Sequence, residues 1–78
     1  MASQVDSPKN GEAKRRLGLR ISVRREARGI SQRQFAQSLD MDHVNLWKIE
    51  KGASNVKFDT LCKIAEGLGV EVEDLFRD

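Results

Sequence analysis

The sequence predicts a compact all-α protein, a five-helix bundle with a helix-turn-helix over residues 32–50. Three observations lead to this fold class. Apolar residues recur at intervals of three and four instead of alternating. Residues that cap and end helices divide the chain into short segments, and the connections between the segments are short. With 78 residues the chain is expected to form one small domain.

The N-terminal part divides into a polar tail and a first helix. Residues 1–12 contain Ser, Pro, Asn and Gly and almost no apolar side chains, so we expect a disordered tail there. The helix-turn-helix domain is then predicted over residues 13–78. Its first helix is predicted from Ala13 to Arg28, because Gly29 follows and glycine commonly ends helices.

The second and third helices are marked by their N-terminal caps. Ser31 and Gln34 have the spacing of a capping box, which predicts a helix that starts at Ser31. Asp42 is a good N-cap for a third helix ending near Glu50. The joint between them is so short that the helices must cross steeply, as in a helix-turn-helix. Asp40, in this joint, is expected to adopt a left-handed backbone conformation.

Two further helices are predicted in the C-terminal part. The fourth spans about residues 58–67, and the fifth is a short turn near residues 72–76. The apolar face of the fourth helix consists of Phe58, Leu61, Cys62, Ile64, Ala65 and Leu68. Because Cys62 belongs to this face, we expect it to be an inert core residue.

Composition excludes several classes of function. The chain has one cysteine and one histidine, so it cannot form an internal disulfide, a typical zinc site or a nucleophile–base pair. We therefore expect no catalytic residues, no metal and no cofactor. No apolar run approaches the ~20 residues that cross a membrane, and the N-terminus has no apolar signal region. We expect a cytoplasmic protein without a membrane partner, and nothing suggests a small-molecule ligand.

Charge is distributed unevenly along the chain. Residues 1–57 hold 12 of the 14 Lys and Arg residues, and residues 58–78 hold 6 of the 12 Asp and Glu residues. A basic N-terminal part indicates a polyanionic partner, whereas the alternative is a surface that is merely charged unevenly.

The third helix has two chemically different faces. At about 100° per residue, Leu46 and Ile49 fall on one side and are expected to pack inward. The opposite side carries His43, Val44, Trp47, Lys48 and Lys51, with Asn45 at the margin. For the indole of Trp47 we favour an outward position against DNA or a partner subunit. The alternative is that it folds against the loop at residues 55–57.

Residues 29–52, GISQRQFAQSLDMDHVNLWKIEKG, resemble the lambda-repressor/Cro family of helix-turn-helix proteins, also called the XRE family. The match needs no gap and includes Gly29, Ser31, Gln32, Ala36, Leu39, Leu46, Ile49, Glu50 and Gly52. The resemblance extends over about residues 15–76. It implies a transcriptional regulator that binds double-stranded DNA through the outer face of the third helix, in the major groove.

The resemblance and the helical wheel together give candidate residues. Those expected to read base edges are His43, Val44, Asn45, Trp47 and Lys48. Those expected to bind phosphates are Gln32, Arg33, Lys51, Asn55 and Lys57. The resemblance also pairs Arg25 with Glu50. The basic cluster at residues 14–16 is either a DNA-reaching arm or a solvated helix start.

The resemblance implies a homodimer that acts as a repressor or autoregulator on a palindromic operator. The acidic C-terminal part is the expected dimer surface, through Val70, Val72 and Phe76, because it lies away from the basic part. Two alternatives stay open. One is the controller protein of a restriction–modification or phage locus. The other is an antitoxin or adaptor whose main partner is a protein, for which only residues 1–12 offer an additional binding segment.

Overall fold

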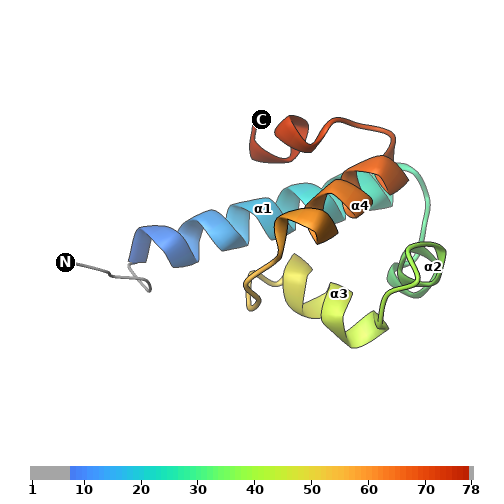
Figure 1. Ribbon diagram of the computed structural model, residues 1–78, viewed down its shortest axis with the longest axis horizontal. Coiled ribbons are helices and arrows are strands. Elements are labelled where there is room, and N and C mark those ends of the chain that lie inside the picture. The colour runs from blue at the N-terminus through green and yellow to red at the C-terminus, as the bar shows by residue number, and fades with distance from the viewer. Residues whose placement is uncertain (1–7, 78) are drawn as a thin grey trace.

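The computed structural model describes residues 8–77 and consists of four α-helices followed by one 3-10 helix (Figure 1). The helices are α1 (Pro8–Ala27), α2 (Gln32–Ser38), α3 (His43–Glu50), α4 (Phe58–Leu68) and the 3-10 helix η1 (Val72–Phe76). The described part of the chain has no strand, so the all-helical prediction is confirmed. Nor does any helix in this part combine the length and the apolar composition needed to cross a membrane.

The long helix α1 is the support on which the other elements are assembled. It runs along the longest dimension of the molecule, with α4 beside it and α3 on another side (Figure 1). It begins at Pro8, five residues before the predicted start, which is consistent with the preference of proline for the first helical turn. Residues 8–12 are therefore helical instead of disordered. The rest of the predicted tail, residues 1–7, lies outside the described residues.

The predicted fifth helix is the second difference from expectation. Residues 72–76 form a 3-10 helix, so the bundle has four α-helices and not five. Short segments adopt this tighter helix because a few residues give too few hydrogen bonds to nucleate an α-helix. The backbone N–H of Glu71 donates to the carboxylate of Asp74 at 3.0 Å and fixes its start.

The caps of the helix-turn-helix agree largely with the sequence. The backbone N–H of Gln34 donates to Oγ of Ser31 at 3.1 Å, and the N–H of Ser31 donates to Oε1 of Gln34 at 3.0 Å. This reciprocal pair is the predicted capping box. Asp40 has a φ of 54°, as expected for the turn. Asp42 occupies the N-cap position of α3, although its side chain makes no capping hydrogen bond.

The core lies where α1, α2, α3, α4 and η1 converge. Its buried apolar residues are Ile21, Phe35, Ala36, Leu39, Leu46, Ile49, Leu61, Ile64, Ala65, Leu68 and Leu75. Two members of the predicted α4 face do not belong to it. Phe58 is 63% exposed and Cys62 is exposed, so the expectation that Cys62 is a core residue is wrong. Phe58 is the first residue of α4, so its side chain lies at the end of the buried face, and Cys62 lies one turn later at the edge of that face.

The approach of α1 to the end of α3 depends on two glycines. A Cβ at Gly18 would lie 2.4 Å from the carbonyl oxygen of Glu50. A Cβ at Gly52, whose φ is +76°, would lie 2.7 Å from Cα of Arg15. Neither contact leaves room for a side chain, so glycine allows the two backbones to come this close. This close packing fixes the position of the third helix relative to α1.

Candidate nucleic-acid interface

The exposed face of α3 is the one that the sequence predicts. Leu46 and Ile49 are buried at 0% and 3% exposure, whereas Val44 and Trp47 are 54% and 46% exposed. Asn45 and Lys48 are also exposed, and His43 is half-buried at the first position of the helix. Thus α3 presents a mixed apolar and polar surface to solvent while its opposite side anchors it in the core.

Trp47 lies toward α1 and not toward the loop before α4. It lines a hollow of about 460 Å³ together with Leu19 and Ser22 of α1. The ammonium of Lys51 lies 5.8 Å from the centre of its ring, a cation–π distance. Asn45 instead shares a hollow of about 260 Å³ with the loop residues Asn55 and Lys57. The outward position of the indole is therefore present, and the packing of Trp47 against residues 55–57 is not.

An ion pair connects the end of α1 to the end of α3. Nε of Arg25 lies 2.8 Å from Oε2 of Glu50, and Nη2 donates to Oε1 at 3.1 Å. Both side chains are more than nine-tenths buried. Nη1 of Arg25 also donates to the carbonyl oxygen of Ile30 at 2.7 Å, which ties down the segment between α1 and α2. The ion pair implied by the resemblance is therefore present, and it joins three parts of the domain.

Electrostatics favour the charged form of this arginine. The hydrogen bond to Glu50 raises the pKa of Arg25 above its ordinary value, and the attraction of Glu50 and Glu26 acts in the same direction. Burial acts in the opposite direction but is the weaker influence. The guanidinium is therefore a permanent cation, and it holds Glu50 in one orientation.

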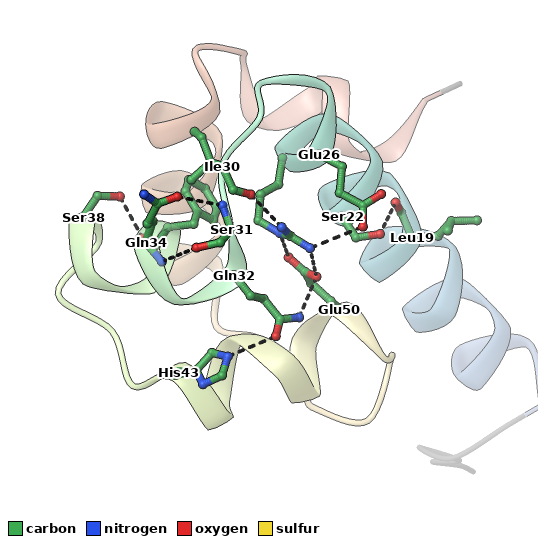
Figure 2. Close-up of polar contacts among 12 residues, drawn as sticks. Leu19, Ser22, Glu26, Ile30, Ser31, Gln32, Gln34, Ser38, His43 and Glu50 are labelled. Carbon is green, nitrogen blue, oxygen red and sulfur yellow. Dashed lines mark hydrogen bonds and ion pairs between the residues drawn. The ribbon is translucent and has the colours of Figure 1, made fainter.

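The ion pair continues into the start of the helix-turn-helix (Figure 2). Nε2 of Gln32 donates to Oε1 of Glu50 at 2.8 Å, and Oε1 of Gln32 lies 3.2 Å from Nε2 of His43. A continuous chain therefore runs from Arg25 through Glu50 and Gln32 to His43. The sequence did not predict the contact between Gln32 and His43, because no local pattern relates residues eleven positions apart. Both amide atoms of Gln32 are engaged inside the protein.

The remaining phosphate-binding candidates are exposed around this face. Arg33 lies on the first turn of α2, Lys51 follows α3, and Asn55 and Lys57 lie in the loop before α4. The three residues of the basic cluster at 14–16 have different surroundings. Arg16 lies 3.5 Å from Glu12, the backbone and side chain of Arg15 pack at Gly52, and Lys14 lines a hollow with Asn55.

The C-terminal candidates differ in their exposure. Val70 and Val72 are half-buried and pack against the core, whereas Phe76 is 54% exposed. Phe58 is exposed as well, although the helical pattern predicts it on the apolar face of α4. The exposure of Phe58 could have been predicted from its position in the first turn of α4, because side chains of a first turn are only partly covered by the rest of the helix. Within residues 8–77, no three His, Cys, Asp or Glu side chains are grouped so as to hold a metal ion.

Similarity to known proteins agrees with this architecture. Residues 16–77 match the family described as helix-turn-helix domain. The control protein C.MunI from Mycoplasma sp is 37% identical over 68 residues, which is 86% of this chain and 92% of that protein. The crystal structure of the restriction-modification controller protein C.AhdI from Aeromonas hydrophila has a TM-score of 0.77 and 31% identity, over 80% of this chain and 94% of the other. An HTH-type transcriptional regulator of Rickettsia conorii is 33% identical over 60 residues, and the chain spans about half of its length, 48%.

Proposed function

This chain belongs to the helix-turn-helix domain family, and from that premise we propose that it is a transcriptional regulator that binds a specific site in double-stranded DNA. The observation that carries the proposal is the exposed face of α3. It offers hydrogen-bonding, apolar and cationic side chains side by side, while Leu46 and Ile49 fix the helix in the core. A convex helix with such a face fits the major groove, where each base pair displays a different pattern of donors, acceptors and methyl groups.

The candidate residues divide by position into two groups. His43, Val44, Asn45, Trp47 and Lys48 all lie on α3, and we propose that they read base edges. Arg33, Lys51, Asn55 and Lys57 lie at helix ends and in loops around α3, and we propose that they bind phosphates. For Gln32 we propose a phosphate contact too, but only as a secondary role, since its amide is already engaged with Glu50 and His43.

A homodimer is the proposed binding form. One recognition helix contacts only a few base pairs, and two-fold pairing of helix-turn-helix proteins places two such helices about 34 Å apart on one side of the duplex. We propose that the paired surface includes Phe76 and the edges of Val70 and Val72. With DNA as its target and bacterial proteins as its relatives, we propose a cytoplasmic location.

A more specific role is favoured by the length of the matches. The chain covers 92% of the control protein C.MunI and 94% of C.AhdI, and C.AhdI is a restriction-modification controller protein. We therefore propose, as a second and narrower candidate, control of a restriction–modification locus. The antitoxin or adaptor alternative has no comparable observation in its favour.

The proposal is tested by selecting binding sites from a random duplex library with the purified chain. We expect one enriched sequence with two-fold symmetry. A triple variant with Val44, Asn45 and Lys48 replaced by Ala should enrich no sequence, because it removes side chains from the exposed face of α3 and leaves its buried face intact. If the wild-type chain also enriches none, the DNA-binding proposal is wrong and the adaptor alternative gains support.

The narrower role has its own test. A controller protein is expected to bind duplexes taken from upstream of the restriction and modification genes in the genome that encodes this chain. Binding there at the salt concentration where random DNA is released supports the narrower role. Selection of a symmetric site absent from that locus contradicts it without affecting the broader proposal.

A further inference from the structure

The chain of contacts from Arg25 to His43 fixes the orientation of the Gln32 side chain. Glu50 is a carboxylate, because both of its oxygens contact the guanidinium of Arg25. A carboxylate can only accept hydrogen bonds. The group of Gln32 that lies 2.8 Å from Oε1 of Glu50 must therefore be its NH₂ group, because the amide oxygen at that distance would repel the carboxylate.

The orientation of the Gln32 amide also determines which ring nitrogen of His43 donates a hydrogen bond. With its NH₂ group turned to Glu50, Gln32 presents its amide oxygen to His43, 3.2 Å from Nε2 (Figure 2). An amide oxygen can only accept, so the hydrogen on this side must come from Nε2 of His43. In a neutral imidazole one ring nitrogen is a donor and the other an acceptor. A neutral His43 with its hydrogen on Nε2 therefore has a free lone pair on Nδ1.

We propose that Gln32 is a positioning residue that fixes the tautomer of His43, so that Nδ1 acts as a hydrogen-bond acceptor for the amino group of adenine or cytosine. This inference rests on the proposed function, since it assigns a base class to one residue of that site. His43 is the first residue of α3 and is half-buried, and its second ring nitrogen points away from Gln32 (Figure 2). The first residues of a recognition helix are the ones that approach base edges.

The base class follows from the donor pattern of the major groove. Adenine N6 and cytosine N4 are the amino donors there, whereas guanine O6 and N7 and thymine O4 are acceptors. A lone pair on Nδ1 is attracted to the first two and repelled by the others. If His43 had the opposite tautomer, Nδ1 would donate and the preference would be for guanine or thymine. Gln32 and Glu50 thus act on base choice without touching a base.

The first test is spectroscopic and needs no DNA. Correlation spectra of the full chain, with ¹⁵N-labelled histidine at pH 8, report which ring nitrogen carries the hydrogen. That pH is well above the range in which an ordinary imidazole is charged. We expect the hydrogen on Nε2, and a hydrogen on Nδ1 overturns the proposal. In Gln32→Leu the two ¹⁵N shifts should move toward each other, because both tautomers become populated. The matched control is Gln37→Leu, which removes an exposed amide of α2 and should leave the spectrum unchanged.

The second test measures the base contact in the selected site. The position that depends on His43 is found by repeating the selection with His43→Ala. At that base pair the amino group is removed by replacing adenine with purine, or cytosine with pyrimidin-2-one. We expect this change to weaken binding of the wild-type chain about tenfold, and binding of His43→Ala by much less. Comparison with His43→Ala corrects for the weaker base pairing of the analogue.

The outcomes separate the two proposals. An equal loss in the wild-type chain and in His43→Ala overturns the inference, and so does a selected site that does not change in His43→Ala. Both leave the DNA-binding proposal intact. Failure to enrich any site overturns both. If Gln32→Leu retains the tautomer and the full tenfold preference of the wild-type chain, Gln32 is not the positioning residue and the inference is wrong. If Gln32→Leu does not fold, the wild-type spectrum still tests the tautomer of His43, and the comparison with His43→Ala still tests the base contact.

Discussion

The face of α3 and the C-terminal surface of α4 and η1 differ in how their side chains are held. On the α3 side, a chain of hydrogen bonds fixes Arg25, Glu50, Gln32 and His43 relative to one another. Within residues 10–77 no buried side-chain polar atom lacks a hydrogen-bond partner. On the C-terminal side, Phe58 and Phe76 are more than half exposed. Both surfaces leave apolar area for contacts with another molecule, because Val44 and Trp47 on α3 are also about half exposed, and the α3 face is in addition organised by this chain of polar contacts.

Removal of the buried ion pair between Arg25 and Glu50 is expected to have the largest effect on stability. In Arg25→Ala the carboxylate of Glu50 stays buried without its cation, and the carbonyl of Ile30 loses its donor. We expect a loss of about 3–5 kcal/mol in the free energy of unfolding, measured in urea. The control is Arg33→Ala, an exposed arginine, which should change it by about 0.5 kcal/mol or less. A loss below about 1 kcal/mol in Arg25→Ala would mean that the chain of contacts is not what holds α3.

A second change tests the close approach of α1 to α3 through the backbone alone. Gly18→Ala places a methyl group 2.4 Å from the carbonyl oxygen of Glu50, so the helices must separate. We expect a loss of about 1–3 kcal/mol in unfolding free energy. Gly11→Ala, in the same helix, meets nothing closer than 3.9 Å and should stabilise the protein by about 0.5–1 kcal/mol. Equal effects of the two substitutions would show that the position of α3 does not depend on this contact.

The α3 face itself can be divided into residues that read bases and residues that bind phosphates. Lys48→Ala should remove about 1–3 kcal/mol of discrimination at one base position in each half-site. Lys57→Ala should weaken binding to every sequence and lower the salt slope by about one, because one fewer counterion is released. Salt titrations on the selected duplex and on a scrambled duplex measure both effects. Equal losses for Lys48→Ala on the two duplexes would contradict its role in reading sequence.

The C-terminal surface is tested by the oligomeric state. If Phe76 lies in a dimer interface, Phe76→Ala should raise the dimer dissociation constant at least about fivefold, measured by analytical ultracentrifugation. The unfolding free energy of Phe76→Ala should differ little from that of the wild type at concentrations where both are monomeric, because the Phe76 side chain is already exposed. Val44→Ala is the control: this residue is 54% exposed on α3, which lies on the side of the molecule opposite η1 (Figure 1). A wild-type chain that stays monomeric at millimolar concentration contradicts the dimer.

The smallest expected effect concerns Asp74, at the C-terminal helix. The hydrogen bond from Arg77, and then that from the backbone of Glu71, lowers the pKa of the Asp74 carboxyl. A carboxyl whose pKa is lower in the folded than in the unfolded chain stabilises the fold above its unfolded pKa of about 3.9. That contribution is lost as the pH falls through the folded value. We therefore expect the stability difference between the wild type and Asp74→Asn to shrink below about pH 4 in acid unfolding curves. The Asp74 side chain lies at the surface and is 28% exposed, so the effect should be small. A stability difference that grows on acidification contradicts a lowered pKa of Asp74.

Much of the fold follows from local patterns in the sequence. The capping box of Ser31 and Gln34 and the strained turn at Asp40 depend only on residues close in the chain, so both were predictable. The division of α3 into inner and outer faces follows from helical periodicity in the same way. The predictions that failed concern the ends of elements and the extent of burial. The start of α1 at Pro8, the 3-10 form of η1, and the exposure of Phe58 and Cys62 all differ from expectation.

The sequence by itself therefore determined the order of the helices, the helix-turn-helix and the outward face of α3, because each depends on neighbours within about four residues. The tertiary structure alone decided which apolar side chains the core has room for, and it brought Gln32 into contact with both Glu50 and His43. Such contacts join residues 11 and 18 positions apart. They exist only because α1, α2 and α3 pack together, and no local spacing in the sequence encodes that packing.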